Sequence, residues 1–143
     1  MTQTMPTATD AARRADASRL LRLVLRVDSV STAVMAVVLI AAVGPLGDAT
    51  GMSAGFTVGF GIYQLGGAAA LALIAGYPAI PPALARAVIA VNLLSGAACL
   101  VVAFADLMAL TGFGVVFMVI GALVVTVYAV LEYVGLRRLT DAG

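Results

Sequence analysis

Three polar residues, Asp28, Asn92 and Glu132, lie inside long apolar stretches of the sequence. Asp28 and Asn92 each follow an arginine by six residues, and Glu132 precedes one by five. At a helical rise of about 1.5 Å per residue, these offsets place all three roughly 7–9 Å from the level of their arginine. The spacing predicts one polar layer in which two carboxyl groups and an amide bind a proton, a cation or one another.

Asp28 has no charged partner one helical turn away, where the sequence has Val24, Leu25, Ser31 and Thr32. Its partner is therefore expected on another helix or in water, and the candidates are Asn92, Tyr128, Arg86 and Glu132. Two interpretations of the layer stay open. Hydrogen bonding that fastens helices together is favoured over a substrate or proton site. Gln64, near the middle of an apolar stretch, is likewise expected to hydrogen-bond a neighbouring helix.

The chain contains no histidine and a single cysteine, Cys99. Without histidine it cannot supply the usual axial ligand of haem, a histidine metal site or a histidine proton relay. One cysteine cannot form an intrachain disulfide or a CxxC redox pair. With no nucleophile–base pair in evidence, the sequence predicts no catalytic residue, no metal site and no cofactor. The net charge of +1 gives no basis for nucleic-acid binding.

Four apolar segments must position the polar residues, at 20–43, 55–76, 83–104 and 113–136. Each is long enough to cross a hydrocarbon layer about 30 Å thick as a helix. Composition agrees, since 63% of the residues are hydrophobic, 10% are charged and the mean hydropathy is +1.13. The predicted fold is all-α: a polytopic membrane protein with a polar cytoplasmic tail over 1–17, an antiparallel four-helix transmembrane bundle over 18–139 and a short tail over 140–143.

The basic residues are all arginines, and they lie on one side of the predicted bundle: Arg13, Arg14, Arg19, Arg22, Arg26, Arg86, Arg137 and Arg138. The connections 44–54 and 105–112 carry only Asp48 and Asp106 as charged residues. The positive-inside rule therefore places both termini in the cytoplasm. Because the connections are short, consecutive helices are expected to be antiparallel neighbours.

An offset of 64 residues superposes Arg22, Asp28 and Ser31 on Arg86, Asn92 and Ser95. Two hairpins with the same orientation would form a parallel repeat, as in some transporters. The alternative, which the sequence favours, is that both helices begin with arginine because both start in the cytoplasm.

Small residues recur at spacings that bring helices close together. Gly114, Gly121 and Gly135 fall on a seven-residue spacing, and Gly55 and Gly59 are four residues apart. In lipid, such positions let helix backbones approach and pack. Gly114 and Gly121 are expected to pack inside the bundle, whereas Gly55 and Gly59 fit either internal packing or the face of a homo-oligomer.

Three motifs, at 21–28, 44–47 and 85–92, resemble those of small four-span integral membrane proteins that are abundant in high-GC bacteria and generally have no assigned activity. The resemblance covers the bundle and implies a multi-pass protein of the bacterial inner membrane without known catalytic residues. The chain is also similar in size and span count to the small multidrug exporters, whose essential carboxylate lies in the first helix. Those exporters have glutamate where this chain has Asp28, and a tryptophan that this chain lacks.

The expected function is that of a non-enzymatic inner-membrane protein in the lipid bilayer. It would be a structural or accessory subunit that packs with itself or with a partner membrane subunit. The alternative is a small proton- or cation-coupled transporter or channel. In that case Asp28 and Glu132 would respond to the ion, and Asn92, Gln64 and Tyr128 would orient a substrate.

Overall fold

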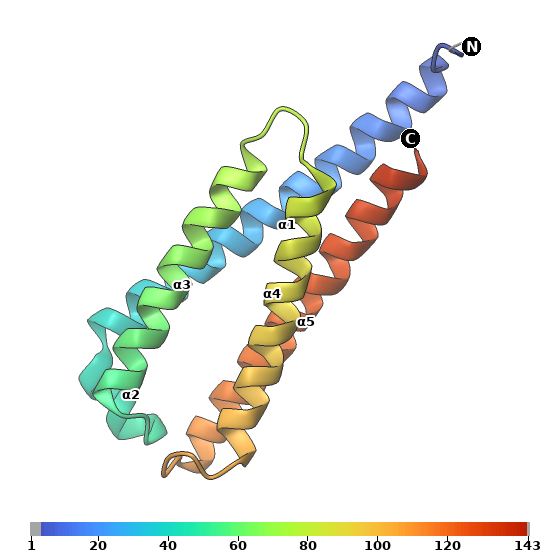
Figure 1. Cartoon of the computed structure of the whole chain (residues 1–143). Helices are drawn as coiled ribbons and strands as arrows, with labels where there is room; N and C mark the ends of the chain where they lie inside the picture. The colour runs from blue at the N-terminus through green and yellow to red at the C-terminus, as the bar shows by residue number, and fades with distance from the viewer. Residues whose placement is uncertain (1–3, 143) are drawn as a thin grey trace.

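The computed structural model describes residues 4–142, and every regular element in that range is a helix (Figure 1). The elements are α1 (Ala8–Ala41), α2 (Val43–Thr50), α3 (Ala54–Ala75), α4 (Pro82–Phe104) and α5 (Gly112–Asp141). All but α2 are long and apolar enough to cross a membrane. The predicted all-α protein with four candidate spans is therefore confirmed.

The first helix begins well before the apolar segment, in the region predicted to be a polar tail. Thr7 caps it: the amide of Asp10 donates to the Thr7 hydroxyl oxygen, and a carboxylate oxygen of Asp10 accepts from the Thr7 amide, both at 3.2 Å. The Thr7 hydroxyl also donates to the Asp10 carboxylate at 2.7 Å, and this bond, followed by the one from the Thr7 amide, holds the pKa of Asp10 below its ordinary value of 3.8. The tail is therefore helical from Ala8 onward, while residues 1–3 and 143 of the two predicted tails lie outside the described residues.

The segment predicted as the loop 44–54 contains the short helix α2. This helix ends at Gly51, whose φ of +78° is a conformation that favours glycine. The connection between α4 and α5 is hydrogen-bonded to the end of α2: the Thr111 amide donates to the Thr50 carbonyl at 2.9 Å, and the Thr111 hydroxyl donates to the Ala49 carbonyl at 2.6 Å. The connection that contains α2 and the α4–α5 connection are therefore joined to each other at the end of the bundle opposite the chain termini.

The four long helices form two hairpins. Helix α1 packs along α3, and α4 packs along α5, while contact between the hairpins comes mainly from α1 and α5. Helices α3 and α4 barely touch, although they are consecutive spans (Figure 1). The expectation that all consecutive helices would be packed neighbours is therefore wrong at this pair. One reason is that the Arg22 guanidinium of α1 donates to the carbonyls of Ala75, Tyr77 and Pro78, which ties the end of α3 to α1.

The hydrophobic core is divided into two clusters, one toward each end of the bundle. The cluster nearer the chain termini contains Leu21, Leu25, Leu71, Ala75, Ile80, Ala85 and Leu136. The cluster nearer α2 contains Leu39, Met52, Cys99, Ala103, Met118 and Ala122. The hairpins are therefore packed together at both ends and less completely between them.

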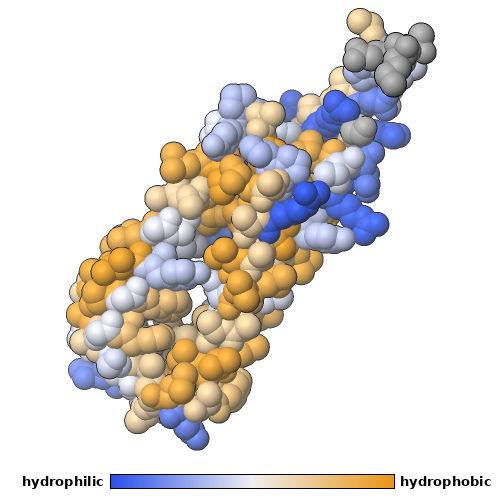
Figure 2. All heavy atoms as spheres, in the orientation of Figure 1, coloured by the Kyte–Doolittle hydropathy of each residue, from blue (hydrophilic) through white to orange (hydrophobic). Residues whose placement is uncertain are grey.

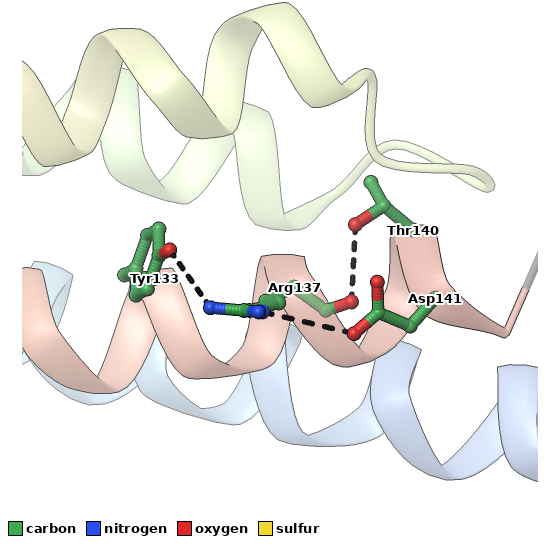
Figure 3. A network of polar contacts seen from close by, with 4 residues as sticks. All are labelled: Tyr133, Arg137, Thr140 and Asp141. Carbon is green, nitrogen blue, oxygen red and sulfur yellow. Dashed lines mark hydrogen bonds and ion pairs between the residues drawn. The ribbon is translucent and has the colours of Figure 1, made fainter.

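Helices α1 and α5 extend together past the other helices, and hydrophilic residues gather at this end (Figure 2). The Arg14 guanidinium donates to the Ala142 carbonyl at 3.0 Å, which links the start of α1 to the end of α5. In the last turns of α5, Arg137 donates to the Tyr133 hydroxyl at 3.3 Å and lies 3.8 Å from the Asp141 carboxylate (Figure 3). These polar side chains mark the end of the apolar part of α5.

Candidate functional site

The predicted polar layer exists, with Asn92 of α4 at its centre. Its side-chain nitrogen donates to a carboxyl oxygen of Asp28 on α1 at 2.9 Å and to one of Glu132 on α5 at 3.0 Å. The exposed fractions are 1% for Asp28, 9% for Asn92 and 0% for Glu132. One amide therefore joins two buried carboxyl groups from two other helices, using both of its N–H donors.

Asp28 has a second partner on its own helix. The hydroxyl of Thr32 donates to the other carboxyl oxygen of Asp28 at 3.0 Å. The expectation that Asp28 would find partners only on other helices or in water is therefore wrong in part. A residue four positions along a helix lies on the same face, and a neutral hydroxyl can donate there without any opposite charge. Both oxygens of Asp28 are consequently hydrogen-bonded.

Glu132 is not fully satisfied. Its second carboxyl oxygen is buried and has no hydrogen-bond partner among residues 4–142. Arg86, one predicted partner of Asp28, is exposed on α4, and within the described chain no arginine forms an ion pair with either carboxyl group. No group of three or more metal-ligating side chains occurs among the described residues either. The layer thus contains two carboxyl groups and no compensating protein cation.

A cleft of about 560 Å³ lies between the two hydrophobic clusters, lined by all four long helices. The space-filling view shows the hollow between the hairpins (Figure 2). Most lining side chains are aliphatic or aromatic, but Asn92 and Thr32 of the polar layer contribute to its wall. Asp28 and Glu132 lie behind them, out of direct contact with the cleft.

Two tyrosine–serine hydrogen bonds cross between the hairpins at the cleft. Ser31 of α1 lies 2.8 Å from the Tyr128 hydroxyl of α5, and Ser95 of α4 lies 2.7 Å from the Tyr63 hydroxyl of α3. The two serines are 64 residues apart and the two tyrosines 65. The two serines are thus equivalent under the 64-residue offset, whereas the two tyrosines lie one residue out of that offset.

Gln64 and Tyr128 do not join the carboxyl groups. Tyr128 bonds to Ser31, as described, and Gln64 lines the cleft. The interhelical hydrogen bond expected for Gln64 does not form with any residue the structure describes. The polar group of α4 nearest along the chain to this level, Ser95, bonds instead to Tyr63, the residue before Gln64.

The five glycines predicted to pack helices fall in three environments. A side chain at Gly114 would collide with the Thr50 backbone, and one at Gly135 would come within 3.1 Å of the Leu21 Cα. Gly121 lines the cleft, and a Cβ there would lie 3.8 Å from the Cys99 sulfur, an ordinary contact. Gly121 therefore faces α4 inside the bundle, but its backbone approaches α4 less closely than the backbones of Gly114 and Gly135 approach their partners. Around Gly55 and Gly59 a Cβ would meet nothing within 4 Å, so they do not pack inside the bundle.

Sequence reasoning missed three side chains that support the layer. Thr32 bonds to Asp28, and its four-residue spacing was a usable signal. Ser29 is buried beside Asp28 and donates to the Ala68 carbonyl at 2.8 Å, which joins α1 to α3. Arg22 binds the end of α3 through carbonyl groups, for which the sequence holds no local signal.

The arrangement offers hydrogen-bond donors and acceptors, a carboxyl pair and an apolar space, rather than a nucleophile with its base. No protein-family model matches the chain, and no curated protein or solved structure is detectably similar to it.

Proposed function

We propose that this chain is a non-enzymatic membrane protein whose Asp28–Asn92–Glu132 layer fastens its two hairpins together. The observation that carries the proposal is the single amide of Asn92 donating to both buried carboxyl groups. Hydrogen bonds of this kind are a recognised means of holding helices together where lipid offers no hydrophobic drive.

The protein would act as a structural or accessory subunit that packs with itself or with a partner subunit. The outward position of Gly55 and Gly59 on α3 supports this, since both lie where another helix could approach without meeting this chain. We place the protein in the bacterial inner membrane with both termini in the cytoplasm. The arginines near the paired ends of α1 and α5 support that orientation.

The orientation predicts the labelling of introduced cysteines in intact cells. In a Cys99→Ala background, cysteines replacing the exposed Asp48 and Asp106 should react with an impermeant thiol reagent, and a cysteine at Ala79 should react only after lysis. Labelling of the Ala79 variant in intact cells, with the other two protected, would reverse the orientation.

A second function is favoured by the unpartnered oxygen of Glu132. Two buried carboxyl groups that share one donor, with no arginine beside them, would repel one another if both were charged, and a proton or a small cation bound between them would relieve that repulsion. A proton or small cation that exchanges at this position would make the protein a small ion-coupled transporter, with Asp28 and Glu132 as the responding groups.

Asp28→Asn separates the two functions. If the layer is a fastening, the variant should fold with a loss of only about 0.6 kcal/mol, the average for a neutral hydrogen bond between membrane helices. The reason is that its amide can still bond to Asn92, and the Thr32 hydroxyl can turn to accept. Stability would be measured by unfolding in mixed detergent micelles, with the exposed Asp106→Asn as the matched control.

The same variants would be reconstituted in vesicles with an imposed pH gradient, and proton flux followed with a trapped pH-sensitive dye in sodium or potassium buffer. The fastening role alone predicts no flux above that of protein-free vesicles for any variant. Flux in the parent that is lost in Asp28→Asn but kept in Asp106→Asn, with both variants folded, would instead establish the transport function.

A further inference from the structure

We propose that the cleft between the hairpins binds a neutral, elongated apolar molecule with a hydroxyl head group. This goes beyond the proposed fastening role and does not depend on it. The cleft volume of about 560 Å³ lies within the range of about 300–1,000 Å³ that is typical of small-molecule sites. Its walls come from all four long helices, so both hairpins would hold the ligand.

The lining explains why the ligand is neutral. No aspartate, glutamate or arginine lines the cleft among the described residues. Gln64 lies 12 residues before Gly76 at the end of α3, which places it roughly 18 Å from that end at about 1.5 Å per residue. This depth is within the hydrocarbon, where a charged head group costs several kcal/mol and the phosphate of a bilayer lipid does not reach.

The polar groups of the cleft explain why the head group is a hydroxyl. The Gln64 amide faces the cleft without a partner among residues 4–142, so it offers both a donor and an acceptor. The hydroxyl pairs of Tyr63 with Ser95 and of Ser31 with Tyr128 border the same space. A hydroxyl both donates and accepts, so it can satisfy the amide and join either pair without bringing a charge into the membrane.

The shape of the space favours an elongated body. A second hollow of about 360 Å³ adjoins the cleft and shares Phe60, Tyr63, Ser95, Cys99 and Met118 with it. This hollow lies between α3 and α4, and its wall also includes Phe56 of α3 and Leu94, Ala98 and Val102 of α4. Because the two hollows share these lining residues, an elongated ligand can contact both, whereas a compact ligand would leave the second hollow unfilled.

The experiment uses the purified full-length protein in phospholipid nanodiscs and a hexadecanol that carries a photoreactive diazirine on its chain. Two probes with the same chain and diazirine serve as comparisons, one ending in a methyl group and one in an ammonium group. After illumination, labelled residues are located by mass spectrometry. We expect the alcohol to label cleft-lining positions of α3 and α4 about tenfold more than the hydrocarbon, since only the alcohol can bond to the amide.

Two neighbouring glycines of α3 provide a matched pair of variants. Gly67 lines the cleft and Gly66 does not, and a Cβ at either position would meet nothing within 4 Å. Gly67→Leu therefore fills the cleft, while Gly66→Leu adds the same side chain on the exposed face. We expect Gly67→Leu to reduce labelling by about tenfold and Gly66→Leu to leave it unchanged. Gly121→Leu fills the cleft from the other hairpin, and is the substitute if Gly67→Leu does not fold.

Gln64→Leu tests the head group. It should bring alcohol labelling down to the level of the hydrocarbon without lowering hydrocarbon labelling. Equal labelling by alcohol and hydrocarbon in the parent would overturn the hydroxyl preference. Stronger labelling by the ammonium probe would overturn neutrality, and unchanged alcohol labelling in folded cleft-filling variants would overturn the site. None of these outcomes depends on whether Asp28→Asn alters proton flux, so failure of the site and failure of the fastening role are distinguishable.

Discussion

Gly114→Ala is expected to lower the stability of the folded protein by about 2–3 kcal/mol. The added Cβ would lie 2.9 Å from the carbonyl carbon of Thr50 and closer still to its oxygen. The obstacle is backbone, which cannot turn aside as a flexible side chain can. This carbonyl also accepts the Thr111 amide, so moving it would weaken the link between α2 and the α4–α5 connection.

Two other alanine substitutions on α5 serve as controls. A Cβ at Gly112 meets nothing within 4 Å, and one at Gly121 makes only an ordinary contact with the Cys99 sulfur. Both variants should stay within about 0.5 kcal/mol of the parent or gain stability from the higher helix propensity of alanine. Unfolding in mixed detergent micelles, followed by circular dichroism, measures all three. Equal stability of the Gly114 and Gly112 variants would show that α2 does not dock against α5.

Asn92→Leu should be the most damaging side-chain substitution in the polar layer, with a loss of about 3 kcal/mol. Leucine has the same branched arrangement of side-chain heavy atoms but no donor, so one oxygen of Asp28 and one of Glu132 would lose their hydrogen bond together. Glu132 already has one buried oxygen without a hydrogen-bond partner, and this change would also remove the Asn92 amide from its other oxygen.

Gln64→Leu is the matched control, because it also exchanges an amide for an aliphatic side chain within a span. The Gln64 amide has no partner in the described chain, so its loss should change stability by less than about 0.5 kcal/mol. Adding Glu132→Leu to Asn92→Leu should recover part of the lost stability by removing the orphaned carboxyl group. If Gln64→Leu lowered the stability of the folded protein as much as Asn92→Leu does, the fastening role would be contradicted.

The four candidate spans were predictable because a helix in lipid needs a long apolar run, and each run is visible without any knowledge of the fold. The position of the polar layer was predictable for a related reason, since arginines mark one membrane boundary and a fixed rise measures depth from it. This reasoning brought Asp28, Asn92 and Glu132 to one level.

Contacts between helices were not predictable in the same way. A seven-residue spacing puts Gly114, Gly121 and Gly135 on one face, but the partner of that face changes along its length from α2 to the cleft to α1. Conversely, no spacing singled out Gly61, where a Cβ would lie 3.2 Å from the Ala36 carbonyl oxygen at the contact of α1 with α3. Sequence spacing describes one helix, whereas a close approach depends on two.

The division into two hairpins has a consequence for how the protein is made. Residues 8–75 form one hairpin and residues 82–141 the other, so a ribosome completes the first before the second is synthesised. During that interval Asp28 is in the membrane with Thr32, but its interhelical partner Asn92 does not yet exist. The unfinished chain therefore holds an acidic group within the bilayer whose interhelical donor is supplied only when α4 is made. Until then, an incompletely synthesised molecule differs from a finished one in the hydrogen bonding of this carboxyl group.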